Sequence, residues 1–181
     1  MRLRSASVNA TAFVAAGAFA IGAANAEQLK NHYRDPFVQV TTAIAACPLP
    51  RGPFMTEREA QAEAHPRIER GTTCFMAGKC KEPNAYRYDA TIAGHARAAV
   101  VDAVGKTPAL AQSSVWLTVQ RRFIFAQGCV GDKRQIAQWE AVLRRVPDVE
   151  YVSADFAVGS SPKQFRRVPY PVMPADNATP P

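Results

Sequence analysis

The sequence predicts an α+β fold: an α-β-β-α-β sandwich over residues 89–158, with two helices on one face of a three-stranded mixed sheet, plus an N-terminal helical extension. Apolar residues alternate with polar or small ones over residues 115–119 and 124–130, as in strands. Between residues 136 and 146 the apolar spacing becomes helical. Alternation returns over residues 149–158. The order of these patterns sets the predicted topology.

The amino terminus has the pattern of a secretory signal peptide. Arg2 and Arg4 supply the positive region, residues 10–24 are rich in alanine, and an Ala-Asn-Ala sequence ends at Ala26. A buried alanine-rich helix or a membrane anchor is the alternative, but an apolar run of about 15 residues is short of the ~20 that span a bilayer. We therefore expect cleavage of residues 1–26, a periplasmic or secreted location, and no transmembrane segment after cleavage.

The charge of the chain is basic, with a formal net charge of +7. Loss of Arg2 and Arg4 with the signal peptide leaves a moderate basic surplus. An exported basic protein meets anionic phospholipid headgroups and envelope polymers rather than nucleic acid. The alternative is that the charge only keeps the protein in solution.

The chain carries Cys47, Cys74, Cys80 and Cys129, an even number that favours two disulfides in an exported protein. Cys74 and Cys80 could close a short loop, which would leave Cys47 and Cys129 to join the N-terminal segment to the sheet. The opposite pairing, with Cys74 and Cys80 both bonded outward, stays open. The spacing is too long for the usual zinc pattern, and a Cys-x-x-Cys redox pair is absent, so no metal and no cofactor are expected.

Residues 27–88 are predicted to form the helical, Cys-containing extension. Asp35 and Pro36 favour a helix start, and the apolar spacing after them continues to Cys47, where several prolines end it.

A second helix of the extension is predicted over residues 57–70. Thr56 and Glu59 form a capping box at its start, Pro66 is expected to kink or split it, and Gly71 is a plausible terminator. Its charged sequence predicts a mostly solvated helix. The connection that follows has little regularity.

The 89–158 unit begins with a helix that Asp89 can cap and that runs to about residue 104. Arg121 and Arg122 separate the first two strands and predict a hairpin. On the sheet face away from the helices, the predicted residues are too apolar for full exposure: Trp116, Phe123, Phe125, Cys129, Tyr151 and Ala157. We expect residues 37–80 to pack there, fastened by a disulfide to Cys129, although a one-residue register error would exchange the two faces.

The last residues, 159–181, are rich in proline and are predicted to form a disordered tail.

The strand patterns Val115-x-Leu-x-Val119, Ile124-x-Ala-x-Gly-x-Val130 and Val149-x-x-Val-x-Ala-x-Phe-x-Val158 together resemble the BON domain (bacterial OsmY and nodulation). The resemblance covers residues 89–158. Where the family has glycines, this chain has Asp148 before the last strand and Arg121-Arg122 in the hairpin. The resemblance implies an α-β-β-α-β sandwich in the periplasm or secreted. It also implies a non-catalytic role in holding phospholipid, polysaccharide or protein partners at the cell envelope.

A binding surface is predicted from basic residues with an aromatic neighbour: Arg121, Arg122, Arg144, Arg145 and Trp116. Guanidinium groups bind phosphate oxygens, and each surface arginine near an anionic membrane contributes about 1 kcal/mol. The alternative is that these are scattered solvated charges.

Acid pairs such as Glu57 with Glu59, or Asp89 with Asp102, fall on predicted exposed helix faces, so no catalytic residue is assigned. The sequence therefore predicts a non-catalytic envelope protein that contacts anionic phospholipid or envelope partners. A chaperone-like or structural protein that recognises other proteins through its sheet face or edge is the alternative. A disulfide-dependent enzyme is least favoured.

Overall fold

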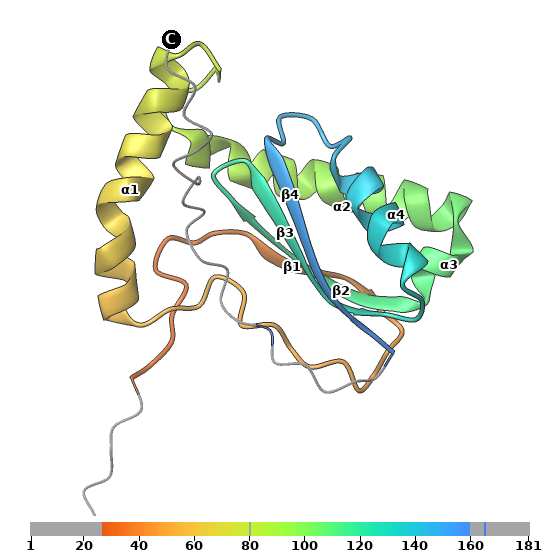
Figure 1. Cartoon of the computed structure of the whole chain (residues 1–181). Helices are drawn as coiled ribbons and strands as arrows, with labels where there is room; N and C mark the ends of the chain where they lie inside the picture. Colours follow the sequence, from red (N-terminus) through yellow and green to blue (C-terminus); the bar gives the residue numbers. More distant parts are fainter. Residues whose placement is uncertain (1–26, 80, 160–164, 166–181) are drawn as a thin grey trace, which may run out of the picture.

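The computed structural model describes residues 27–79, 81–159 and 165, without the side chains of residues 69–74 (Figure 1). Its elements follow the chain in the order β1 (Phe37–Thr42), α1 (Glu57–Met76), the 3-10 helix η1 (Ala85–Tyr88), α2 (Asp89–Lys106), α3 (Pro108–Ala111), β2 (Ser113–Gln120), β3 (Phe123–Val130), α4 (Arg134–Leu143) and β4 (Tyr151–Val158). The predicted signal peptide and almost all of the predicted tail lie outside the described residues.

The sheet has four strands in the order β1-β2-β3-β4. The β1–β2 and β2–β3 pairs are antiparallel, and β3 pairs with β4 in parallel. The α+β class is confirmed, and α2-β2-β3-α4-β4 has the predicted order. The predicted three-stranded sheet is too small by one strand.

The additional strand corrects a sequence prediction, because residues 35–47 were expected to form a helix. Instead Phe37–Thr42 is strand β1, with Val38 opposite Leu117 and Thr42 opposite Ser114. The β-branched residues of this short segment suit a strand. Pairing with β2 gives the backbone N–H and C=O groups of this segment hydrogen-bond partners. A short helix without packing partners would be marginal in water.

The main core lies between the sheet and helices α2 and α4, which cover the same face (Figure 1). From the helices, Ile92 and Trp139 are fully buried, and Leu117 and Ile124 lie beneath them in the sheet. Burying each large apolar side chain stabilises the fold by about 1.5–3 kcal/mol. This layer is the one that the alternating and helical patterns predicted.

The opposite sheet face is also buried, and the segment after β1 covers one part of it. Ile44, Cys47 and Phe165 pack with Cys129 and Ala157. A disulfide joins Cys47 to Cys129 across a Cα–Cα distance of 5.7 Å. The predicted link between the extension and the sheet is thus confirmed for this pair. The pairing of Cys74 and Cys80 lies outside the described side chains.

Helix α1 is longer than predicted, since it continues through Pro66 and past Gly71 to Met76. The predicted stop at Gly71 is wrong. The capping box at its start is confirmed: the Glu59 N–H donates to Thr56 Oγ1 at 3.2 Å, and the Thr56 N–H donates to Glu59 Oε2 at 2.8 Å. No helix among the described residues combines the length and the apolar character that crossing a bilayer requires.

Candidate functional site

Strand β1 ends the sheet on one side, so one of its edges has no strand neighbour in the described chain. The Val119 N–H donates to the Pro36 carbonyl at 3.0 Å. Because backbone groups alternate in direction along an antiparallel pair, Phe37 and Gln39 turn their N–H and C=O groups away from β2. The segment Phe37–Thr42 contains no charge and no proline, residues that commonly protect a sheet edge. A bulge near Gln39 is its one irregularity in pairing.

A groove runs along this edge between β1 and helix α2, and we call it the edge groove. It consists of two hollows of about 370 Å³ each, which follow one another along the strand. The first is lined by Pro36, Phe37, Val38, Ala90, Ala93, Gly94 and Arg97. The second is lined by Val40, Thr41, Thr42, Ala43, Val100, Val101, Val104 and Ala111. A strand edge beside an apolar groove is an arrangement that accepts an extended polypeptide.

Helix α2 provides the wall of the edge groove with small and apolar side chains. A Cβ added at Gly94 would meet nothing within 4 Å, so the space beside it is open. Further along the helix, Val101 is 74% exposed although it is apolar. The helix therefore keeps room for a second chain near its middle and offers apolar surface near its end.

Among the described residues that line the edge groove, Arg97 is the one cation, in the hollow beside Phe37 and Val38. Among the described residues, the Arg97 side chain takes part in no hydrogen bond or ion pair. Arg97 thus places an uncompensated positive charge in an otherwise apolar groove.

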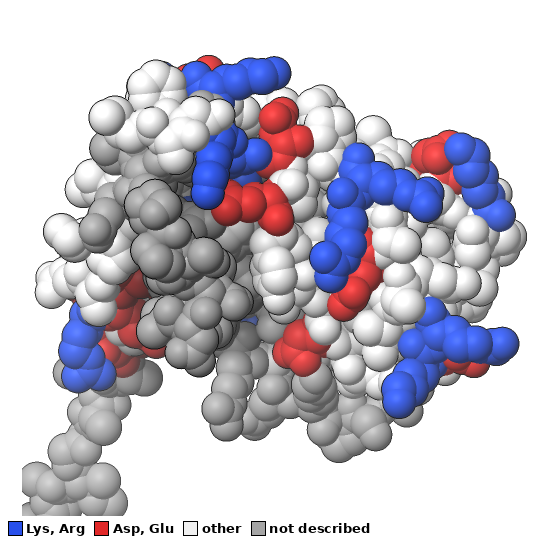
Figure 2. Space-filling model, turned by 45° about the horizontal axis from the view of Figure 1, so that its top comes forward, with Lys and Arg blue, Asp and Glu red and all other residues white. Residues whose placement is uncertain are grey.

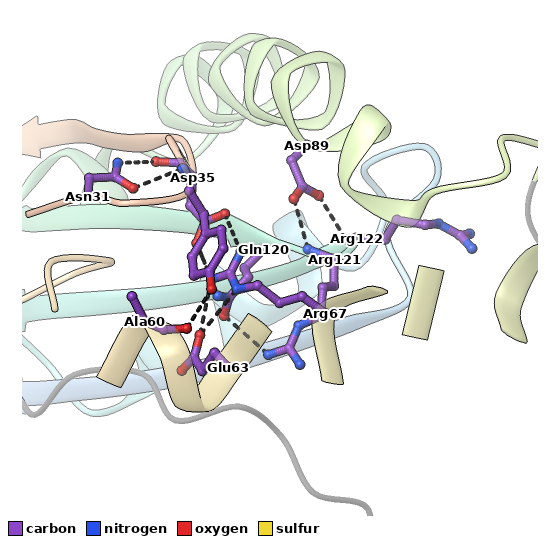
Figure 3. A network of polar contacts seen from close by, with 10 residues as sticks. Asn31, Asp35, Ala60, Glu63, Arg67, Asp89, Gln120, Arg121 and Arg122 are labelled. Atoms are coloured by element: carbon purple, nitrogen blue, oxygen red, sulfur yellow. Dashed lines mark hydrogen bonds and ion pairs between the residues drawn. The ribbon is translucent and has the colours of Figure 1, made fainter. Parts of the chain in front are cut away.

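A buried polar cluster anchors the chain just before β1 (Figure 3). Arg67 of α1 donates to both carboxylate oxygens of Asp35, at 3.0 and 2.7 Å, and its Nε donates to Glu63 at 3.2 Å. The Gln120 side chain also donates to Asp35 at 3.0 Å. Burial lowers the pKa of Arg67, but hydrogen bonding and attraction to Asp35 raise it overall. The Arg67 guanidinium therefore stays charged, and the cluster fixes where β1 begins, which sets the position of the free edge.

Asp89 holds the β2–β3 hairpin rather than capping α2, whose N-cap is Tyr88. Its buried carboxylate accepts the backbone N–H groups of Arg121 and Arg122 at 2.8 and 2.9 Å. Both arginines have positive φ, 60° and 65°, in a turn where glycine is usual. The expectation that Asp89 lies on an exposed helix face is wrong, because it is 3% exposed. Burial raises the pKa of Asp89 to about 7, while the two backbone hydrogen bonds act to lower it.

The structure does not bring the predicted binding residues together on one surface. Arg121 is 1% exposed and Trp116 is 8% exposed, so neither is available to a partner surface. The Arg122 side chain is 12% exposed and donates to the carbonyls of Asp148 and Lys79. The exposed members are Arg144 and Arg145, at the end of α4.

The surface charges seen in Figure 2 are mixed, with most blue side chains next to red ones. Arg144, for example, is 3.3 Å from Glu140, and Lys106 is 2.8 Å from Asp102. Such neighbours reduce the attraction that a basic residue exerts on an anionic surface. This face therefore shows no continuous basic patch.

Sequence reasoning missed the edge groove because residues 35–47 were interpreted as a helix. Two signals were available. The residues between Phe37 and Thr42 also fit alternation, and Arg97 and Val101 lie off the apolar stripe of their helix. Without the fourth strand, the sequence did not indicate that these two side chains lie along one groove.

In the described part of the chain, no three His, Cys, Asp or Glu residues come together in a way that could hold a metal ion.

No protein-family model, curated protein or solved structure matches this chain in the comparisons with known proteins.

Proposed function

We propose that this chain is an exported binding protein of the cell envelope that recognises other polypeptides by adding an extended segment of them to the free edge of β1. The observation that carries the proposal is the edge groove, where an unpaired strand edge faces the open side of α2. Outward N–H and C=O groups give binding that depends little on sequence, and a groove beside them adds side-chain selectivity.

Export is part of the proposal. The Cys47–Cys129 disulfide fits an oxidising compartment, in which such bonds form and persist. The signal-like amino terminus points the same way, although it lies outside the described residues. The resemblance to the BON domain agrees with an envelope location and with a binding role.

The test uses two glycines of the same helix as a matched pair. Gly94 lines the edge groove, whereas Gly105 is near the end of α2 and outside the groove, and both have open space where a side chain would go. Leucine at either position should favour the helix by about 1 kcal/mol or slightly less. Only Gly94→Leu places its side chain in the groove.

The probe is a surface-tethered peptide of alternating valine and threonine with blocked ends, and binding is measured by interferometry. We expect the wild-type protein and Gly105→Leu to bind it, and Gly94→Leu to bind at least about tenfold more weakly. Binding should also slow amide exchange at Phe37 and Gln39. Equal binding by both leucine variants, or protection confined to β4, would reject the edge groove as the site.

Contact with anionic phospholipid is the second candidate, supported by the exposed Arg144 and Arg145. It has less support because Arg121 is buried and Arg122 is held by protein carbonyls. Co-sedimentation with phosphatidylglycerol vesicles, compared with phosphatidylcholine vesicles, tests it. Binding to the anionic vesicles that is lost in the Arg144→Glu/Arg145→Glu variant would favour the lipid function, and no sedimentation at low salt would reject it.

A further inference from the structure

We propose that the edge groove selects an extended segment with an acidic side chain two positions after an aliphatic one, and that Arg97 binds the acidic side chain. The inference rests on the proposed function, since it names the class of partner for the same groove. It makes a separate claim about sequence preference.

The position of the acidic residue follows from the geometry of a paired strand. Val38 is buried on the face that α2 covers. Residues directly opposite one another on neighbouring strands point to the same face of the sheet. A bound residue opposite Val38 would therefore direct its side chain toward α2, into the hollow that Arg97 lines.

The preference for an acidic residue follows from the surroundings of Arg97. Its guanidinium has no anionic partner in the described chain, and the rest of the hollow is apolar or small. A carboxylate can accept two parallel hydrogen bonds from a guanidinium, a geometry that an amide or a hydroxyl matches less well. A lysine at the same place would be repelled.

The aliphatic residue follows from the second hollow. Val40, Val101 and Val104 line it, and none of its described lining residues is charged. A bound residue two positions from the one opposite Val38 would point to the same face of the sheet, where this second hollow lies. Antiparallel pairing, the more stable arrangement per residue, places the aliphatic residue before the acidic one.

The acid is a side chain within the segment rather than a terminal carboxylate. The first hollow continues past Arg97 to Ala90, seven residues earlier on α2. Seven residues are about two helical turns, or roughly 10 Å. The groove thus has room for a chain that passes Arg97 and continues.

The experiment compares tethered peptides with blocked ends in which a single valine lies among threonines. They differ only at the position two residues after this valine, which holds glutamate, glutamine or lysine. A fourth peptide has the glutamate two positions before the valine instead of after it. We expect the protein to bind the glutamate peptide about fivefold more tightly than the glutamine peptide. The lysine peptide and the reversed peptide should bind more weakly still.

Charge exchange supplies the decisive comparison. Arg97→Glu should prefer the lysine peptide over the glutamate peptide. Arg58→Glu is the matched control, because Arg58 is exposed in the first turn of α1, away from the groove, where glutamate is well tolerated. The control should keep the wild-type order, and thermal unfolding checks that both variants fold.

The outcomes separate this inference from the proposed function. If every peptide binds equally and Gly94→Leu still abolishes binding, the groove binds polypeptide but Arg97 does not select an acid. If Arg97→Glu keeps the wild-type order, the inference is likewise overturned. If no peptide binds the wild-type protein, both claims fail.

Discussion

At Gly128, β3 approaches β2 so closely that a side chain has no place. A Cβ there would lie 2.0 Å from the Ser114 carbonyl oxygen, and the residue has a φ of 142° that other residues rarely adopt. The contact lies on the strand that also carries the disulfide. The β2–β3 register therefore requires glycine, which has no Cβ, at this position.

We expect Gly128→Ala to lower the free energy of unfolding by about 3 kcal/mol, because β2 and β3 must move apart to admit the methyl group. Urea denaturation followed by circular dichroism measures the change. Gly105→Ala is the control, since a Cβ there meets nothing within 4 Å. A loss of less than about 1 kcal/mol at Gly128 would contradict the close approach.

Asp89 gives a second prediction at the residue scale. Its pKa is about 7 in the folded protein, whereas the ordinary value, expected in the unfolded chain, is 3.8. Between these values the unfolded chain releases the proton while the folded protein keeps it. The free energy of unfolding should therefore fall as pH rises from about 4 to about 7, by up to about 4 kcal/mol from this group.

Asp89→Asn should remove this contribution to the slope while leaving one acceptor for the hairpin. The check is urea denaturation of both proteins at several pH values across the window. The difference between the two isolates Asp89, because other carboxyl groups are common to both. Parallel curves would show that Asp89 does not titrate in this range.

At the scale of elements, the chain after β1 is secured in two ways. The Ser114 hydroxyl bonds to both backbone groups of Ile44, and the Cys47–Cys129 disulfide follows a few residues later. The disulfide closes a loop with a sequence separation of 82 residues. Long loops gain the most from closure, because the cross-link removes many unfolded conformations.

We expect the Cys47→Ala/Cys129→Ala variant to lose about 4 kcal/mol of stability. Amide exchange should rise first in residues 43–47 and then along β1, before the β2–β3 pair is affected. Exchange measured by mass spectrometry reports both regions in one experiment. Uniform exchange across the sheet would contradict a role confined to the β1 side.

At the scale of the whole molecule, the sequence predicted the layered core but not the edge that carries the candidate site. Alternation at Val115–Val119 and helical spacing around Trp139 reflect burial against a continuous core, which is the strongest signal a sequence contains. Phe37–Thr42 is too short to separate helix from strand by period. Its identity as a strand comes from pairing with β2, a contact distant in sequence.

The burial of Arg121 was not predictable from the sequence for a related reason. Arg121 and Arg122 are predicted to form the turn of a hairpin, and charged turn residues usually lie at the surface. The structure turns the backbone of both arginines toward the carboxylate of Asp89 and buries Arg121. No local pattern shows that a carboxylate 32 residues earlier reaches this turn.

The covalent bond between Cys47 and Cys129 has a mechanical consequence for a chain held along β1. Tension on such a chain would run parallel to the strands, so the β1–β2 hydrogen bonds would resist together in shear rather than open one after another. Any sliding of β1 would then be stopped by the cross-link to β3, two strands inward. If a chain does bind along β1 as proposed, the disulfide should therefore help the protein to keep it under tension.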